Sequence, residues 1–90
     1  MKEVRWSSHA LRNLADREID RPEAETTLAA PETVVPGQPG RRAFMRRYFD
    51  MLLGQEMLLR IVVEETAQAM VVVTLYKTSQ IEKYLRGSTP

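Results

Sequence analysis

Two β-type segments in the second half of the chain constrain the fold more than any other feature. Residues 57–64 alternate between two sets of side chains, which is the pattern of a strand with one buried face. The apolar set consists of Met57, Leu59, Ile61 and Val63. After a polar turn at residues 65–68, the β-branched run at residues 70–77 is typical of a central strand. Because short turns favour antiparallel pairing, these segments predict an antiparallel hairpin.

Two earlier segments extend the expected sheet. Residues 33–35 form a short β-type run that ends at the Pro- and Gly-rich loop at residues 36–40. Residues 44–49 predict another strand, and Gly54 and Gln55 offer a turn into the next one. The sequence therefore predicts a meander of three or four antiparallel strands.

A first short helix is expected after Ser7 or Ser8, because either hydroxyl can cap it. Its apolar stripe would consist of Leu11, Leu14 and Ala15. Its polar face would consist of His9, Arg12, Asn13 and Asp16.

A second helix is expected after Asp20, where residues 20–23 resemble a capping box with Glu23 at N3. It would carry Ala24, Thr27 and Leu28 and end before Pro31. Ser79 can cap a last short helix at residues 80–85.

These elements predict an α+β fold, in which two N-terminal helices pack on a three- to four-stranded antiparallel sheet and a short C-terminal helix follows. The length of 90 residues suits one domain. We expect this domain to span residues 1–86 and the tail at residues 87–90 to be frayed.

The amino-acid composition excludes several kinds of functional site. Without Cys, the chain has no disulfide, no cysteine-ligated metal and no cysteine nucleophile, and its one His excludes a multi-histidine metal site. We therefore expect no metal and no cofactor. The N-terminus has no apolar signal-peptide region, and the longest apolar stretch, residues 69–73, is far shorter than a membrane span. These features predict a cytoplasmic protein without membrane contact.

The charge is distributed unevenly. Residues 1–40 carry five basic and seven acidic groups, a net charge of −2, whereas residues 41–60 carry five and two, a net charge of +3. Basic and aromatic residues interleave at residues 41–49, and the basic ones are Arg41, Arg42, Arg46 and Arg47. This stretch is a candidate surface for nucleic acid, whose phosphates attract such charges. A charged edge strand is the structural alternative.

Several motifs resemble a family of small bacterial domains of unassigned function. Ser8-His9-Ala10-Leu11 followed by Arg17-Glu18-Ile19 resembles the family's "S-x-H-A … R-G-I" opening. Residues 59–63 and 72–78 resemble its "L-R-V-V-V … V-V-T-V-Y-K-T" ending. That family is similar in layout to the RelE/ParE and barnase–EndoU–colicin–RelE group, which contains many ribonuclease toxins. Two positions depart from the pattern: Asn13 stands where members often have Arg, and Glu18 where they often have Gly.

The resemblance implies the toxin-like component of a type II toxin–antitoxin module with metal-independent endoribonuclease activity. Its partners would be a cognate antitoxin and RNA, including ribosome-associated mRNA. An acidic antitoxin tail could also occupy the Arg41–Arg47 stretch. The alternative is a non-catalytic protein-binding module or homodimeric interaction domain of the same fold.

Metal-free RNA cleavage needs proton transfer and a cation beside the phosphate. His9 is the candidate general acid or base because histidine titrates near neutral pH. A local hydrogen bond at the start of the helix is its structural alternative. Arg60, in the middle of an apolar strand, is the candidate phosphate clamp, and an ion pair with Glu64 or another acid is the alternative.

Tyr76 completes the candidate catalytic set as a hydrogen-bond donor or stacking group, with Thr74 on the same face of its strand. Both residue types are also ordinary strand formers. Thr74 joins the expected RNA contacts, as do Arg12, Arg17 and Lys77 together with the four arginines of residues 41–47.

Overall fold

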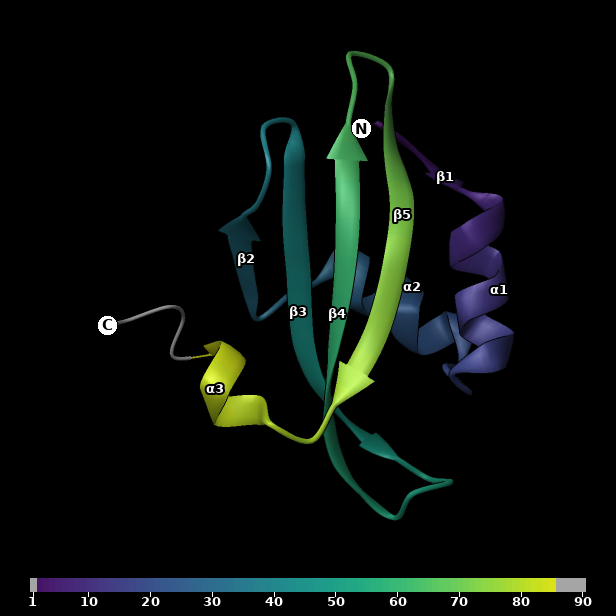
Figure 1. Ribbon diagram of the computed structural model, residues 1–90, viewed down its shortest axis with the longest axis vertical. Coiled ribbons are helices and arrows are strands. Elements are labelled where there is room, and N and C mark those ends of the chain that lie inside the picture. Colours follow the sequence, from purple (N-terminus) through teal and green to yellow (C-terminus); the bar gives the residue numbers. More distant parts are fainter. Residues whose placement is uncertain (1, 86–90) are drawn as a thin grey trace.

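Five strands form one mixed sheet in the order β1–β5–β4–β3–β2 in the computed structural model, which describes residues 2–85 (Figure 1). The strands are β1 (Glu3–Trp6), β2 (Thr33–Pro36), β3 (Arg41–Asp50), β4 (Gln55–Glu65) and β5 (Ala69–Thr78). The helices are α1 (Ser8–Asp16), α2 (Arg21–Ala29) and α3 (Ile81–Leu85). The α+β class and the three expected helices are confirmed. The expected tail at residues 87–90 lies outside the described residues.

Strands β2 to β5 form the expected antiparallel meander. β3 pairs with β4 along its full length, from Arg41 opposite Glu64 to Asp50 opposite Gln55. Gly54 makes the hairpin between them with a φ of 67°, a conformation that costs glycine little. The expected apolar set of β4, Met57, Leu59, Ile61 and Val63, is buried, but Leu58 on the other face is fully buried as well.

The expectation of three or four strands, all antiparallel, is wrong because the sheet has a fifth strand. β1 pairs in parallel with β5, from Glu3 opposite Ala69 to Trp6 opposite Val72. Its sequence alternates Glu3 and Arg5 with Val4 and Trp6, which is a strand signal but only four residues long. The parallel pairing is long-range and depends on the two helices that carry the chain back across the sheet.

The two N-terminal helices begin where the sequence predicts. Ser7 caps α1, and its hydroxyl accepts a hydrogen bond from the Ala10 amide at 3.0 Å. Asp20 is the N-cap of α2, but its side chain makes no capping hydrogen bond, so the expected capping box does not form. Tertiary contacts stabilise these short helices.

The buried face of α1 differs from the expected stripe. Leu11 is 44% exposed, whereas Ala10 and Asn13 are buried. The helix lies beside β5 and presents Asn13 to that strand (Figure 1). Polar contacts with a strand edge thus set its orientation, which an apolar pattern cannot predict.

The C-terminus of α1 ends in a Schellman motif. The Ile19 amide donates to the Leu14 carbonyl at 2.9 Å, and the Glu18 amide donates to the Ala15 carbonyl at 3.3 Å. Glu18 has a φ of 52°, a left-handed conformation that favours glycine. It is the same Glu18 that departs from the glycine of the family pattern.

The core lies between the helices and one face of the sheet. Its buried members are Ala10, Ile19, Ala24, Phe44, Leu59, Ile61, Val63, Val72 and Leu75. Helix α2 crosses behind the sheet in Figure 1, and α3 follows β5 at the C-terminal end. No helix in the described part of the chain is long and apolar enough to cross a membrane.

Candidate functional site

Arg60 lies at the centre of the sheet, on the face opposite the two N-terminal helices. It is opposite Met45 of β3 and Tyr76 of β5 in the strand register. Its neighbours in β4, Leu59 and Ile61, point into the helix-side core. The strand alternation therefore places this arginine on the face that carries α3, beside the tyrosine that the sequence predicts as its partner.

Two tyrosines and a methionine surround the Arg60 guanidinium. Its Nη1 donates a hydrogen bond to the Tyr76 hydroxyl, and its Nε donates to the Met45 sulfur at 3.3 Å. The Arg60 Cζ is 4.6 Å from the Tyr84 ring centroid and 5.5 Å from that of Tyr76. The two rings meet edge to face at 6.5 Å and 70°. We call Arg60, Tyr76 and Tyr84 the Arg60 cluster.

The Arg60 guanidinium has no carboxylate partner among the described residues. The expected alternative partner, Glu64, instead pairs with Arg41 at 3.1 Å. Arg60 uses Nε and one Nη1 hydrogen for the contacts with Met45 and Tyr76, while Nη2 has no acceptor within residues 2–85. A guanidinium with free donors in a planar fork suits an oxyanion such as phosphate.

The arginines of residues 41–47 are engaged differently. Arg42 pairs with Glu65 at 2.6 Å and Arg47 with Glu32 at 2.9 Å, while Arg46 donates to the Ala30 carbonyl at 2.8 Å. Hydrogen bonds from Arg47 lower the pKa of Glu32 below its usual range. Protein acceptors thus engage the charges of this stretch.

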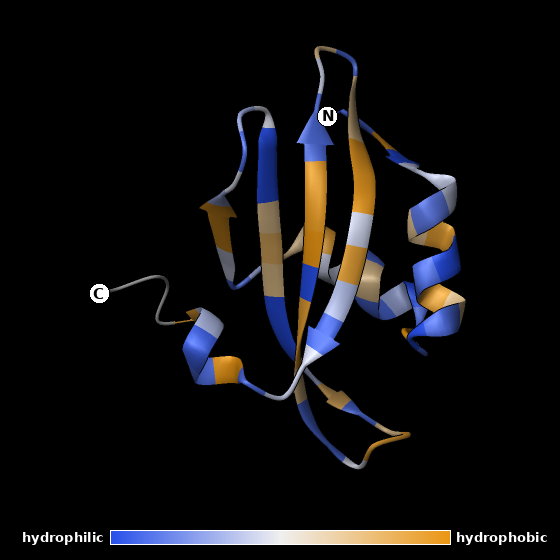
Figure 2. Cartoon of the chain, viewed as in Figure 1, coloured by the Kyte–Doolittle hydropathy of each residue, from blue (hydrophilic) through white to orange (hydrophobic). Residues whose placement is uncertain are grey.

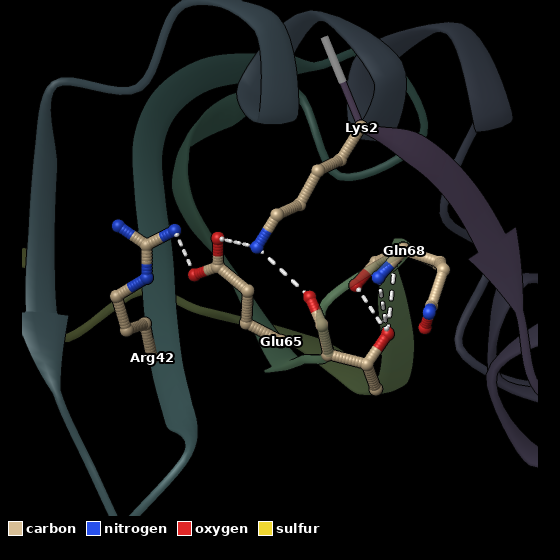
Figure 3. Close-up of polar contacts among 6 residues, drawn as sticks. Lys2, Arg42, Glu65 and Gln68 are labelled. Carbon is tan, nitrogen blue, oxygen red and sulfur yellow. Dashed lines mark hydrogen bonds and ion pairs between the residues drawn. The ribbon is translucent and has the colours of Figure 1, made fainter.

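The ion pair of Arg42 belongs to a larger polar network (Figure 3). Glu65 also accepts a hydrogen bond from Lys2 Nζ at 2.8 Å, and Lys2 donates to the Thr66 carbonyl at the same distance. The Lys2 hydrogen bond, with the nearby Arg42 charge, lowers the pKa of Glu65. The network links β3, the β4–β5 turn and the residue before β1, so its role here is structural.

The charged-edge explanation of residues 41–47 is wrong. β3 is an inner strand between β4 and β2, and the edges of the sheet are β1 and β2. Its arginines pair across strands and with the loop before β2, rather than protecting an unpaired edge.

Three polar side chains of the α1 region bind the part of β5 that β1 does not cover. The Ser7 hydroxyl donates to the Val73 carbonyl at 3.1 Å, and Arg17 donates to the Leu75 carbonyl at 2.9 Å. Asn13 Oδ1 accepts from the Leu75 amide at 3.2 Å and from the Thr74 hydroxyl at 2.7 Å. These side chains supply the hydrogen bonds that a neighbouring strand would make.

This arrangement explains where four of the expected site residues lie. Arg17 and Thr74 take part in the contacts between α1 and β5. His9 and Arg12 are exposed on α1, and neither side chain forms a hydrogen bond or an ion pair with another described residue. The structure thus brings Arg60 and Tyr76 together, with Thr74 in the next register position of the same face, and places His9 on the helix beside β5.

Lys77 lies on the helix side of the sheet, in a polar cluster that the sequence gives no sign of. Its Nζ is 2.7 Å from Asp50 Oδ2 and donates to the Glu18 carbonyl at 2.9 Å. Asp50 is 4% exposed and also accepts from the Tyr48 hydroxyl at 3.1 Å and the Leu53 amide at 3.0 Å. The Lys77 hydrogen bond leads the effects that lower the pKa of Asp50, and burial raises the pKa of Tyr48.

Comparison with known protein families identifies the family of this chain. A family model described as a domain of unknown function (DUF4258) matches residues 6–77. The chain belongs to this family. No curated protein and no solved structure matches the chain.

The family match spans most, but not all, of the candidate site. Arg60 and Tyr76 lie within the matched residues, whereas Tyr84 and the rest of α3 follow them. The family domain therefore contains the arginine and its hydrogen-bonded tyrosine, and α3 adds the second ring. No group of three or more His, Asp or Glu side chains within residues 2–85 could hold a metal ion.

Proposed function

We propose that this DUF4258 chain is a toxin-like protein that acts on RNA, and that Arg60 binds an RNA phosphate. The observation that carries the proposal is the state of Arg60: a half-buried cation at the centre of the sheet, on the face that carries α3, with an unpaired Nη2 and no carboxylate partner among the described residues. A half-buried cation without a counter-ion is costly, and an anionic ligand would supply one.

The rings of the Arg60 cluster suit single-stranded RNA. The Tyr76 hydroxyl accepts its hydrogen bond from Arg60, so its own proton is free to be donated to a phosphate oxygen. Tyr84 and Tyr76 are half-buried and offer ring surface on which an unpaired base can stack. Lys83, with its Nζ 5.6 Å from the Tyr84 ring, adds a second cation near the same ring.

Cleavage requires proton transfer in addition to binding. In the proposed mechanism Arg60 stabilises charge on the phosphate, Tyr76 donates a hydrogen bond, and His9 acts as general acid or base. Because α1 lies beside β5, the RNA would have to pass over β5 to reach both groups (Figure 1). Phosphate binding depends on Arg60 and proton transfer on His9, so a variant of each residue tests its role.

The binding test uses fluorescently labelled single-stranded RNA and fluorescence anisotropy. Arg60→Met keeps an unbranched apolar chain beside Met45 but removes the charge, and we expect it to weaken RNA binding by about tenfold to a hundredfold. The matched control is Arg5→Met, because Arg5 is an exposed arginine on β1, paired with Glu3 and outside the cluster. The control should bind within about twofold of the unmodified protein.

The cleavage test compares His9→Ala with Arg60→Met on the same RNA by gel electrophoresis. We expect His9→Ala to slow cleavage by about a hundredfold or more while leaving RNA affinity nearly unchanged. Unaltered cleavage would remove His9 from the mechanism. If Arg60→Met and Arg5→Met bind RNA equally well, the RNA proposal is wrong and the alternative of a non-catalytic protein-binding module is favoured.

A further inference from the structure

The tip of the β3–β4 hairpin displays large apolar side chains to solvent. Their exposed fractions are 58% for Phe49, 84% for Met51, 72% for Leu52 and 51% for Leu53. The hairpin extends beyond the rest of the sheet, and its tip is coloured as hydrophobic in Figure 2. None of the four residues belongs to the buried core. Large exposed apolar side chains that lie together in this way are typical of interaction sites.

The turn that carries these residues is fixed by hydrogen bonds. The Asp50 carboxylate accepts from the Leu53 amide at 3.0 Å, and the Asp50 carbonyl accepts from the Gly54 amide at 2.7 Å. Lys77 holds the same carboxylate from β5 at 2.7 Å. The apolar side chains therefore project from a pre-organised turn, which lowers the entropic cost of binding a partner.

Three acidic side chains border this patch. Glu18, Asp20 and Glu23 line a cavity of about 80 Å³ together with Phe49, Met51 and Leu52. None of the three carboxylates forms an ion pair with another residue in the range 2–85. The tip thus combines apolar side chains with unneutralised negative charge on one side. We call these six residues the acidic hairpin surface.

The negative charge of the acidic hairpin surface indicates which kind of partner can bind there. A second copy docked by two-fold symmetry would add its own three carboxylates to the interface and, from the same six residues, no cation to neutralise them. An anionic membrane would be repelled for the same reason. A protein segment with Lys or Arg beside apolar residues is complementary in both respects, because its cations meet the carboxylates while its apolar side chains cover Met51 and Leu52.

We infer that the acidic hairpin surface binds a basic, amphipathic segment of a partner protein. The hairpin surface and the Arg60 cluster share no residue. The inference goes beyond the proposed action on RNA and does not depend on it. It also gives the partner a charge opposite to that of an acidic segment bound at residues 41–47.

The test uses short synthetic peptides with identical leucine positions and lysine, glutamate or serine at the remaining positions. Binding to the full chain is measured by fluorescence anisotropy at low and high salt. We expect the lysine peptide to bind at least about tenfold more tightly than the glutamate peptide, with a preference that falls as salt increases.

Two variants of the surface and one control separate the contributions. Met51→Ser combined with Leu52→Ser should weaken lysine-peptide binding by about tenfold or more, because these side chains would be at the centre of the contact. Asp20→Asn combined with Glu23→Gln should reduce the preference for lysine over glutamate. Leu11→Ser, at an exposed leucine on α1, should change neither. Thermal melts followed by circular dichroism check that each variant folds.

Three results would overturn the inference. One is equal affinity for the lysine, glutamate and serine peptides, or no binding of any of them. Another is concentration-dependent dimerisation in analytical ultracentrifugation that Met51→Ser/Leu52→Ser abolishes, since it would identify a second copy as the occupant. The third is binding to phosphatidylglycerol vesicles that the same variant abolishes, since it would identify a lipid surface.

Discussion

Glu18 is strained at the C-terminus of α1, and replacing it with glycine should stabilise the fold. Its φ of 52° is imposed by the Schellman motif, in which Ile19 donates back to Leu14. The Glu18 carbonyl accepts a hydrogen bond from Lys77, but that contact is with the backbone and survives any substitution of the side chain. Glu18→Gly therefore removes the strain and keeps the known contacts.

The expected gain in the free energy of unfolding follows from three effects, two of which stabilise the fold and one of which destabilises it. A side chain in the left-handed conformation costs about 1–2 kcal/mol. Against this, glycine favours unfolding by about 0.5–1 kcal/mol, because it gives the unfolded chain greater conformational freedom. Removal of a negative charge from a helix C-terminus adds about 0.3 kcal/mol at an exposed position. The free energy of unfolding should rise by about 1 kcal/mol, which corresponds to about 4–8 °C in Tm for a domain of this size.

Urea denaturation followed by circular dichroism measures this change. Glu18→Gln is the matched control, because it removes the charge but keeps the side chain, and it should recover only about 0.3 kcal/mol. The reasoning is refuted if Glu18→Gly is less stable than the unmodified protein, or no more stable than Glu18→Gln. The same variant restores the glycine of the "R-G-I" pattern, so a gain would give that glycine a physical reason.

The remaining predictions concern the two polar clusters that hold β5. Asn13→Ala should lower the free energy of unfolding by about 1–3 kcal/mol in urea titrations, because it leaves the buried Leu75 amide without an acceptor. Lys77→Met should cost about 3–5 kcal/mol by the same assay, because it leaves Asp50 buried and charged without its partner. Since the pKa of Asp50 is lowered in the folded state, its contribution is fully present above the unfolded pKa of about 4 and is lost as the pH falls through the lower folded pKa. When the free energy of unfolding is measured at decreasing pH, the unmodified protein should therefore lose stability below about pH 4. Asp50→Asn, which has no carboxylate at this position, should lack this part of the loss.

Periodicity predicted those parts of the fold that large apolar side chains define. The alternation of β4 and the β-branched run of β5 located the central strands within one or two residues. β1 was not predicted because its pairing with β5 is long-range and its alternating pattern covers only four residues. The orientation of α1 was not predicted either. Asn13 is buried because it forms hydrogen bonds with a strand edge, whereas a polar residue normally indicates the solvent-exposed face of a helix.

The alternation of side chains along a strand predicted on which face each candidate site residue lies, but not which of these residues become neighbours. Alternation placed Arg60 and Tyr76 on definite faces of their strands, but the register that makes them neighbours comes from the folded sheet. Tyr84 was not expected in the site, because α3 reaches Arg60 only through the path of the chain after β5. The ion pairs of Arg42 and Arg47 were also out of reach, since their partners are remote in sequence.

Binding of an RNA phosphate by the unpaired Nη2 of Arg60 can be observed directly. The most direct measurement is a titration of the ¹⁵N-labelled protein with single-stranded RNA, followed through the arginine side-chain resonances in NMR spectra. The Arg60 Nη–Hη signals should shift and saturate at the affinity measured by anisotropy, while those of Arg42 and Arg47, whose Nη2 groups are already held by Glu65 and Glu32, should move little. An unmoved Arg60 signal at RNA concentrations that saturate binding would contradict the claim.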